Sequence, residues 1–287
     1  INQNEYNSIL DYIYNLNIGN GNMISKNMLV YRINKNILEK CQNHFTLMEK
    51  SIITLNNHPF WEQKSDIWLS QRKTMLTGTD AGKVVTINSG DKKEEKLFNI
   101  AKDKLDYKEI LRVPNISHFR ISSKAMEHGN IYEDVSIAMY ETRFNVKVSE
   151  YGLIKAIKSG FIGASPDGVI SNVDYSDYES FKRYGRLLEV KNPYTRVIND
   201  EIKPDYVFQM LQQQYTCEIP ICDFLETRFK EYESYEDYKE DGTFTHMSNG
   251  DPKGIMLYFI KNGKPYYEYA PLFISEEEYV KWEADMM

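Results

Sequence analysis

Two short segments of the chain place carboxylates and a lysine where neighbouring strands could bring them together. Asp167 lies in residues 163–170, and Glu189 and Lys191 lie in residues 186–192. Successive side chains of a strand alternate between its faces, so Glu189 and Lys191 share one face while their apolar neighbours point to the other. If the two strands pair as a hairpin, two carboxylates and one ammonium converge.

This combination of groups is suited to the hydrolysis of a phosphodiester. Hard divalent cations such as Mg²⁺ prefer carboxylate oxygens and water, and the bound cation polarises a phosphate and lowers the pKa of its water. A lysine beside the cation can orient or deprotonate that water, or offset the charge that develops on the phosphate. Gly168, directly after Asp167, is expected to let the backbone approach a bound ion closely.

The hairpin must be held by other strands and loops. Residues 171–186 are polar and rich in tyrosine, which indicates a surface excursion between the two strands, and residues 89–95 indicate a loop. Asn262-Gly263 is a strong hairpin signal near the end of the chain. Further strands are expected at 146–149, 161–164, 222–232, 256–260 and 266–269.

A helix running from a cap at Ser122 or Ser123 to about Arg143 supplies another acid. Glu133 lies nearly opposite its expected apolar stripe, and Gly129 lies one turn earlier on the same side. An acid on the polar face of a helix is ordinarily solvated, which is the interpretation that the pattern alone favours. The stripe itself consists of Ile131, Val135, Ala138 and Met139.

Two other helices carry polar side chains of interest. One begins at Ser65 or Asp66 and holds Arg72 one turn beyond Trp68. The following segment, 77–81, has hydroxyls and a glycine and resembles a helix start that can hold an anion through its backbone amides, although many helices begin this way.

The second of these helices follows Pro204. It contains Gln209, Gln212 and Gln213 in one polar row, so at least one glutamine could face the site. A solvated face is the commoner reason for such a row. Phe208, Leu211 and Tyr215 are expected to pack.

The remaining helices are expected to have structural roles. A first helix, capped by Asn34 or Asn36, presents one apolar face as far as Met48, and residues 96–107 form another. Ser275 and Glu278 form a capping box that opens the last helix.

Pro166-Asp167 followed by Glu189-Val190-Lys191 resembles the PD-(D/E)xK nuclease signature. Three further segments, 68–80, 128–133 and 206–209, narrow the resemblance to the lambda-exonuclease, YqaJ-like and viral alkaline exonuclease branch. The resemblance covers roughly residues 67–224 and leaves both ends of the chain outside.

The resemblance implies roles for single residues. Asp167, Glu189 and the Val190 carbonyl would bind metal, Glu133 would complete the site through metal or water, and Lys191 would position or activate the attacking water. Asp134 is the competitor of Glu133. The ion would be Mg²⁺, with Mn²⁺ as a substitute, and two ions are expected.

The same resemblance implies a pocket for the 5'-terminal phosphate of DNA. Its residues would be Arg72, Thr79, Ser165 and Gln209. Thr79 stands where a serine is more usual in the family. A second glutamine, common two residues beyond Gln209, is replaced by Leu211.

Composition places few limits on these interpretations. The 287 residues are 41% hydrophobic with a net charge of −7, and the acids crowd into 226–241 whereas basic residues border the candidate site. Charge is therefore neutral evidence about the binding of nucleic acid.

The chain lacks a run of about 18 apolar residues and a signal pattern, so an intracellular protein that is neither membrane-inserted nor secreted is expected. Cys41, Cys217 and Cys222 indicate buried thiols rather than a disulfide framework.

The fold expected is α/β, with a mixed central β-sheet flanked by helices as in the restriction-endonuclease-like core. A helical N-terminal unit, 1–60, would precede a nuclease-like domain, 61–287. The leading hypothesis is a metal-dependent 5'-to-3' exonuclease on double-stranded DNA ends, acting in viral or phage-type recombination, repair or replication. The alternatives are an endonuclease of the same superfamily and a catalytically inactive nucleic-acid-binding recombination module.

Partners follow from the leading hypothesis. They would be double-stranded DNA ends and a single-strand annealing or single-strand-binding protein, with no membrane. Family members occur both as monomers and as rings, and no residue here decides between these states.

Overall fold

The computed structural model describes residue 11 and residues 26–86, 93–105, 124–156, 158–261 and 263–287. The chain divides into two compact units, residues 1–54 and 55–287. The first unit consists, in its described part, mainly of helix α2, Lys26–Asn56. The cap expected at Asn34 or Asn36 is wrong, because both residues lie inside this longer helix. The expected boundary after residue 60 stays a prediction about domain organisation.

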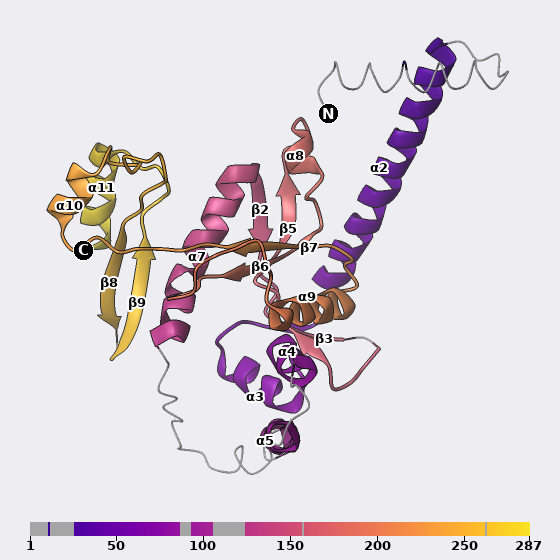
Figure 1. Cartoon of the computed structure of the whole chain (residues 1–287), viewed down its shortest axis with the longest axis horizontal. Helices are drawn as coiled ribbons and strands as arrows, with labels where there is room; N and C mark the ends of the chain where they lie inside the picture. The colour runs from indigo at the N-terminus through magenta and orange to yellow at the C-terminus, as the bar shows by residue number, and fades with distance from the viewer. Residues whose placement is uncertain (1–10, 12–25, 87–92, 106–123, 157, 262) are drawn as a thin grey trace. The chain divides into compact units, whose positions relative to one another are not determined.

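A four-stranded mixed sheet forms the centre of the second unit, in the order β2-β5-β6-β7 (Figure 1). The pairs β2–β5 and β5–β6 are antiparallel, and β6–β7 is parallel. The expected hairpin and mixed sheet are confirmed. The strands are β2, Val146–Ser149; β5, Gly168–Val173; β6, Leu187–Lys191; and β7, Cys222–Glu226.

The connections of the sheet follow from its strand directions. The antiparallel β5 and β6 are joined by a short excursion with helix α8, Tyr178–Phe181, capped by Asp177. The parallel β6 and β7 need a crossover, which is helix α9, Pro204–Cys217. The surface excursion predicted for 171–186 is partly wrong, since β5 continues to Val173 and α8 buries Ser180.

Helix α7, Lys124–Phe144, packs on the sheet through Tyr140. The expected helix is confirmed, although its expected caps lie outside the described residues. Its expected apolar stripe is wrong, because the buried residues are instead Tyr132, Ser136 and Tyr140. Their hydroxyls find hydrogen-bond partners on distant elements, which lets polar-tipped side chains replace aliphatic ones at the interface.

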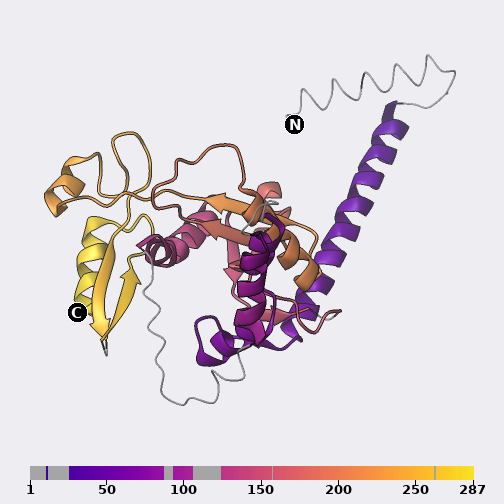
Figure 2. The same cartoon turned by 60° about the horizontal axis from the view of Figure 1, so that its bottom comes forward.

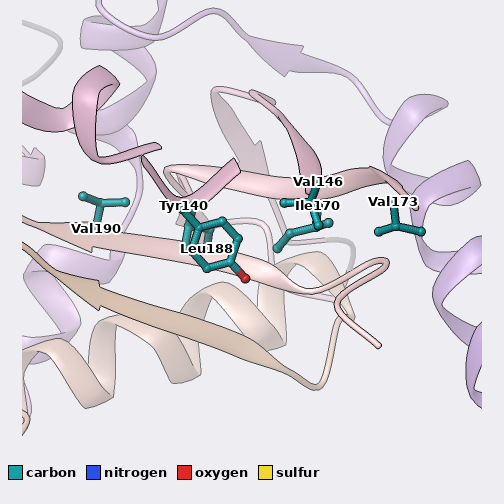
Figure 3. Packing of buried hydrophobic residues seen from close by; sticks show 6 residues of the cluster. All are labelled: Tyr140, Val146, Ile170, Val173, Leu188 and Val190. Atoms are coloured by element: carbon teal, nitrogen blue, oxygen red, sulfur yellow. The ribbon is translucent and has the colours of Figure 1, made fainter. Parts of the chain in front are cut away.

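The core beside α7 is a cluster of apolar side chains from the helix and the sheet (Figure 3). Leu188 and Val190 come from one face of β6, as the alternation of side chains requires. Ile170 and Val173 of β5 are three positions apart, and the irregular β2–β5 register lets both join the cluster. Burial of these groups stabilises the sheet that carries the candidate site. The cluster consists of Tyr140, Val146, Ile170, Val173, Leu188 and Val190.

A three-stranded sheet, β1-β3-β4, contacts helix α9 through β3 and β4, and α9 also packs against α4. The strand expected at 161–164 is shorter, with only β4 in its range, and the loop expected at 89–95 ends by Lys93, where α5 begins. The bounds are β1, Phe60–Trp61; α3, Asp66–Thr74; α4, Gly78–Thr86; α5, Lys93–Leu105; β3, Leu153–Lys155; and β4, Gly163–Ala164.

The C-terminal part pairs β8 with β9 in an antiparallel hairpin, drawn in yellow in Figure 2. This hairpin and the capping box of Ser275 and Glu278 at the start of α11 are confirmed. The strand expected at 222–232 is shorter, because β7 ends at Glu226. The bounds are α10, Tyr235–Glu240; β8, Met256–Lys261; β9, Lys264–Tyr269; and α11, Glu276–Met286. Within the described residues, no helix combines the length and apolar character needed to cross a membrane.

Candidate active site

Asp167 lies at the entrance to β5, and its side chain is held by the neighbouring strand. The backbone N–H of Val190 donates to Asp167 Oδ2 at 2.7 Å. The register of the hairpin places Gly168 opposite Leu188, so Asp167 comes beside the centre of β6. A Cβ at Gly168 would collide with the Val148 side chain of β2, so the glycine admits the neighbouring strand, and its expected role toward a bound ion stays a prediction.

Glu189 is the most enclosed acid of the site. Its side chain is 0% exposed. The Lys191 Nζ donates to Glu189 Oε1 and, at 3.1 Å, to the Val190 carbonyl oxygen. Both residues project from the same face of β6, as their spacing predicts, so the strand itself brings the carboxylate and the ammonium together.

Glu133 projects from the partly buried face of α7 toward the same acids. Burial and then the negative charge of Asp167 raise the pKa of Glu133. Burial and the charge of Asp167 also raise the pKa of Glu189, and burial raises that of Asp167 against the opposing effect of Lys191. These mutual effects mean that the three carboxyls share one electrostatic environment, which disfavours their simultaneous ionisation without a compensating cation.

The donor groups fit a hard cation. Asp167, Glu189 and the Val190 carbonyl offer oxygen atoms only, which is the ligand type that Mg²⁺ prefers. The Lys191 ammonium contacts two of these oxygens, so they face a common point. In the described part of the chain, no group of three or more His, Cys, Asp or Glu side chains is arranged to hold a metal ion by itself. A cation would therefore need the backbone carbonyl or water as further ligands.

Arg72 and Ser165 both contact the indole of Trp68, one at its face and one at its ring N–H. The Arg72 guanidinium carbon is 4.3 Å from the centre of the Trp68 ring, and Trp68 Nε1 donates to Ser165 Oγ at 3.0 Å. Trp68 sits in the first turn of α3, which begins at Asp66, one of the two expected starts, and is capped by Ser65. Since Ser165 precedes Asp167 by two residues, these contacts join Arg72 to the segment that carries the metal-ligand candidate.

Thr79 and Gln209 lie where α4 and α9 touch. A Cβ on Gly78, directly before Thr79, would lie 2.9 Å from Gln209 Cγ and 3.3 Å from the Gln209 carbonyl oxygen. Thr79 is exposed in the first turn of α4. In the same turn, Asp80 Oδ2 accepts hydrogen bonds from the Thr77 N–H and from the Thr77 hydroxyl. These two donors of the helix start are therefore already paired with a carboxylate of the chain itself.

Gln213 was not singled out as a site residue, yet it is the glutamine that reaches the acids. Its Nε2 donates to Glu189 Oε2 at 2.6 Å, and the side chain is 1% exposed. The signal was present, because Gln213 follows Gln209 by four residues and shares its helix face. The expected packing of Leu211 and Tyr215 is wrong, as both are about half exposed, at 51% and 49%.

Gln212 has a structural role beside the site. Its Nε2 donates to the carbonyls of Leu76 and Gly163, at 2.7 and 2.8 Å, and so ties α9 to the segment before α4 and to β4.

Residues 67–220 match the family described as the YqaJ-like viral recombinase domain. The chain belongs to this family. The resemblance inferred from the residues over 67–224 is thereby confirmed, with nearly the same limits.

The YqaJ-like chain is also similar to individual proteins. It is 31% identical over 274 residues to an uncharacterized protein of Acanthamoeba polyphaga mimivirus, an alignment that covers 84% of this chain and 46% of that protein. The chain thus spans about half the length of this viral relative.

Among solved structures, the crystal structure of an alkaline exonuclease from Laribacter hongkongensis aligns with a TM-score of 0.43 and 16% identity. The same enzyme in complex with dAMP aligns with a TM-score of 0.43 and 18% identity. Each alignment covers 77% of this chain and 88% of the other. A likeness at this level assigns no function to the YqaJ-like chain.

Proposed function

We propose that this YqaJ-like domain is a metal-dependent deoxyribonuclease that degrades one strand of double-stranded DNA from a 5' end. The observation that carries the proposal is the contact of the Lys191 ammonium with Glu189 Oε1 and the Val190 carbonyl, next to an Asp167 held by the Val190 N–H. The two carboxylates and the carbonyl can bind a metal ion that activates water for phosphodiester hydrolysis, and the lysine ammonium lies beside them.

In this proposal Asp167, Glu189 and the Val190 carbonyl hold Mg²⁺, for which Mn²⁺ can substitute. The metal, as one or two bound ions, would polarise the phosphate and lower the pKa of a water. Glu133, on whose pKa the charge of Asp167 acts, would complete the site through the metal or through a bound water. Lys191 orients the attacking water and offsets the charge that develops on the phosphate.

The remaining predicted residues hold the end of the DNA. Arg72, Thr79, Ser165 and Gln209 form the pocket for a terminal 5'-phosphate. Arg72 is the cation of this set, and its stacking on Trp68 restricts the directions in which the guanidinium can point. A pocket that binds a terminal phosphate makes the enzyme start at DNA ends.

The test compares three substrates in Mg²⁺: a linear duplex with 5'-phosphate ends, the same duplex with 5'-hydroxyl ends, and a covalently closed circle. The phosphorylated duplex should be degraded fastest, the circle should persist, and Lys191→Ala should abolish cleavage. Equal rates for the two linear duplexes would remove the phosphate pocket, and cutting of the circle would make the protein an endonuclease. DNA binding without cleavage of any substrate would identify a binding module.

The biological setting proposed is viral or phage-type DNA recombination, repair or replication inside a cell. The family description and the viral relative support it. Removal of one strand exposes the other, so the fitting protein partner is a single-strand annealing or single-strand-binding protein. Digestion in the presence of such a protein, followed by measurement of annealed product, tests this coupling.

A further inference from the structure

Lys64, in the loop between β1 and α3, has a backbone conformation that lysine seldom adopts. Its φ is 64°, in the left-handed region that glycine occupies without penalty. Non-glycine residues held in this region often occur at functional sites, where the surrounding structure maintains the strain.

The loop that carries Lys64 is fastened to the segment before Asp167. Gln63 Nε2 donates to the Pro166 carbonyl at 3.5 Å, and Trp68 Nε1 donates to Ser165 Oγ at 3.0 Å. These contacts lie on both sides of Lys64 in the sequence. The loop is thus fixed against the two residues that precede the metal-ligand candidate.

The charge of Lys64 acts on the acids of the site. Lys64 is close enough to Glu133, Asp167 and Glu150 for its positive charge to act on each of these carboxyls. Lys64 is nevertheless exposed to solvent. Lys191, by contrast, already contacts Glu189 and the Val190 carbonyl. Lys191 is thus partly buried among these oxygens, whereas Lys64 is exposed.

An acidic centre repels the DNA backbone unless cations stand at its entrance. Among the described residues, Lys64 makes no ion pair within 4 Å that would explain its position structurally. The flexible side chain of a lysine at this place lets its ammonium contact a backbone phosphate close to the carboxylates.

We propose that Lys64 binds a phosphate of the DNA strand at the acidic centre, adding a substrate contact to those of Lys191 and Arg72. The strained backbone holds the lysine at the entrance of the site, where its charge favours DNA. This inference rests on the proposed nuclease function.

The experiment measures binding of a 5'-phosphorylated duplex by fluorescence anisotropy between about 50 and about 200 mM salt, with Ca²⁺ in place of Mg²⁺ and intact DNA verified on a gel. Lys64→Gly should reduce the slope of log K against log salt by about 1 and weaken binding several-fold. It should also raise the unfolding midpoint, because glycine relieves the left-handed conformation. Lys64→Arg should keep the wild-type slope.

Lys182→Ala is the matched control, since it removes the same charge from a lysine that pairs with Glu179 on α8. It should leave the slope unchanged. A Lys64→Gly protein with the wild-type slope and affinity overturns the inference, whatever its stability. Cleavage by the wild-type protein in Mg²⁺ is measured in parallel: absence of cleavage overturns the nuclease proposal, whereas normal cleavage with an unchanged Lys64→Gly slope overturns only the role of Lys64.

Discussion

Gln213 donates from Nε2 to Glu189 Oε2 at 2.6 Å, and both side chains are enclosed, with 1% and 0% exposure. The other carboxylate oxygen of Glu189 accepts from Lys191. Both oxygens are therefore held by side chains from different elements, α9 and β6. A carboxylate fixed in this way presents its remaining lone pairs in one orientation, which is what a metal ligand requires.

Gln213→Ala should raise the Mg²⁺ concentration needed for half-maximal cleavage about tenfold, because ligand-orienting partners contribute to metal affinity. It should also lower the free energy of unfolding by about 1–3 kcal/mol, since a buried oxygen loses its donor. Mg²⁺ titration of cleavage and urea unfolding measure the two effects. Gln214→Ala is the control, because Gln214 donates to the Pro220 carbonyl at 2.9 Å, away from the acids. Equal Mg²⁺ requirements for both variants would contradict the positioning role.

Mg²⁺ should raise the thermal unfolding midpoint of the protein. Burial raises the pKa of both Asp167 and Glu189, and the negative charge of Asp167 raises that of Glu189 further, so a bound cation relieves an unfavourable arrangement of charge. At a hundredfold excess over the dissociation constant the stabilisation is about 2.7 kcal/mol. Differential scanning fluorimetry with and without Mg²⁺ measures it. Asp167→Asn should lose most of the increase, and a full increase in this variant would argue against Asp167 as a ligand.

Asp80→Asn should destabilise the protein near neutral pH by about 1 kcal/mol. Burial opposes ionisation of Asp80, but Lys104, 2.8 Å away, and the Thr77 donors outweigh it and lower the pKa. A lowered folded-state pKa means that the stabilisation is present above the unfolded-state pKa of about 4 and is lost as the pH falls through the folded-state value.

The difference between wild type and Asp80→Asn should therefore be constant near neutral pH and shrink below about pH 4. Urea unfolding at a series of pH values measures this difference. A difference that grew toward low pH would have the wrong sign for this ion pair.

Asn192→Ala should be more destabilising than Ser136→Ala. Asn192 Oδ1 accepts from Ser136 Oγ at 2.7 Å and from Thr227 Oγ1 at 2.9 Å, and its Nδ2 donates to the Gly129 carbonyl at 3.3 Å. Loss of Asn192 leaves several groups unsatisfied, at about 1–3 kcal/mol for each buried group, whereas loss of Ser136 leaves Thr227 as a donor.

Because this network joins α7 to the residue after Lys191, Asn192→Ala should also lower cleavage by disturbing Glu133 on α7. Chemical unfolding ranks the two variants, and cleavage at saturating Mg²⁺ tests the second effect. The reverse ranking would show that the hydroxyls pair equally well without the amide.

Gly129→Ala and Gly82→Ala should have opposite effects. A Cβ at Gly129 on α7 meets no heavy atom within 4 Å, so alanine should stabilise the helix by about 0.5–1 kcal/mol. A Cβ at Gly82 would lie 2.6 Å from the Asp205 carbonyl oxygen and would push α4 away from α9, with a loss of about 1–3 kcal/mol. Thermal unfolding measures both changes. Retained cleavage in Gly129→Ala would show that a glycine one turn before Glu133 is not needed for activity.

Local patterns predicted much of the fold. The alternation around Glu189 predicted the β5–β6 hairpin, the start of α3 at Asp66 was one of two expected, and Ser275 was correctly identified as a helix cap. These features depend on residues a few positions apart, and their physics is local. The apolar stripe of α7 failed for the opposite reason: its buried face is defined by Tyr140 and Ser136, whose hydroxyls are paired with residues more than 50 positions away.

The candidate site divides in the same way. The sequence by itself determined the family, the types of the chemical groups and the common face of Glu189 and Lys191, because a strand has a period of two. Only the tertiary structure decided that Gln213 contacts Glu189, and that the charge of Lys64 acts on the acids. Those relationships depend on the positions of α9 and of the β1–α3 loop. Packing between residues far apart in the sequence sets these positions, and the local spacing of residues does not encode it.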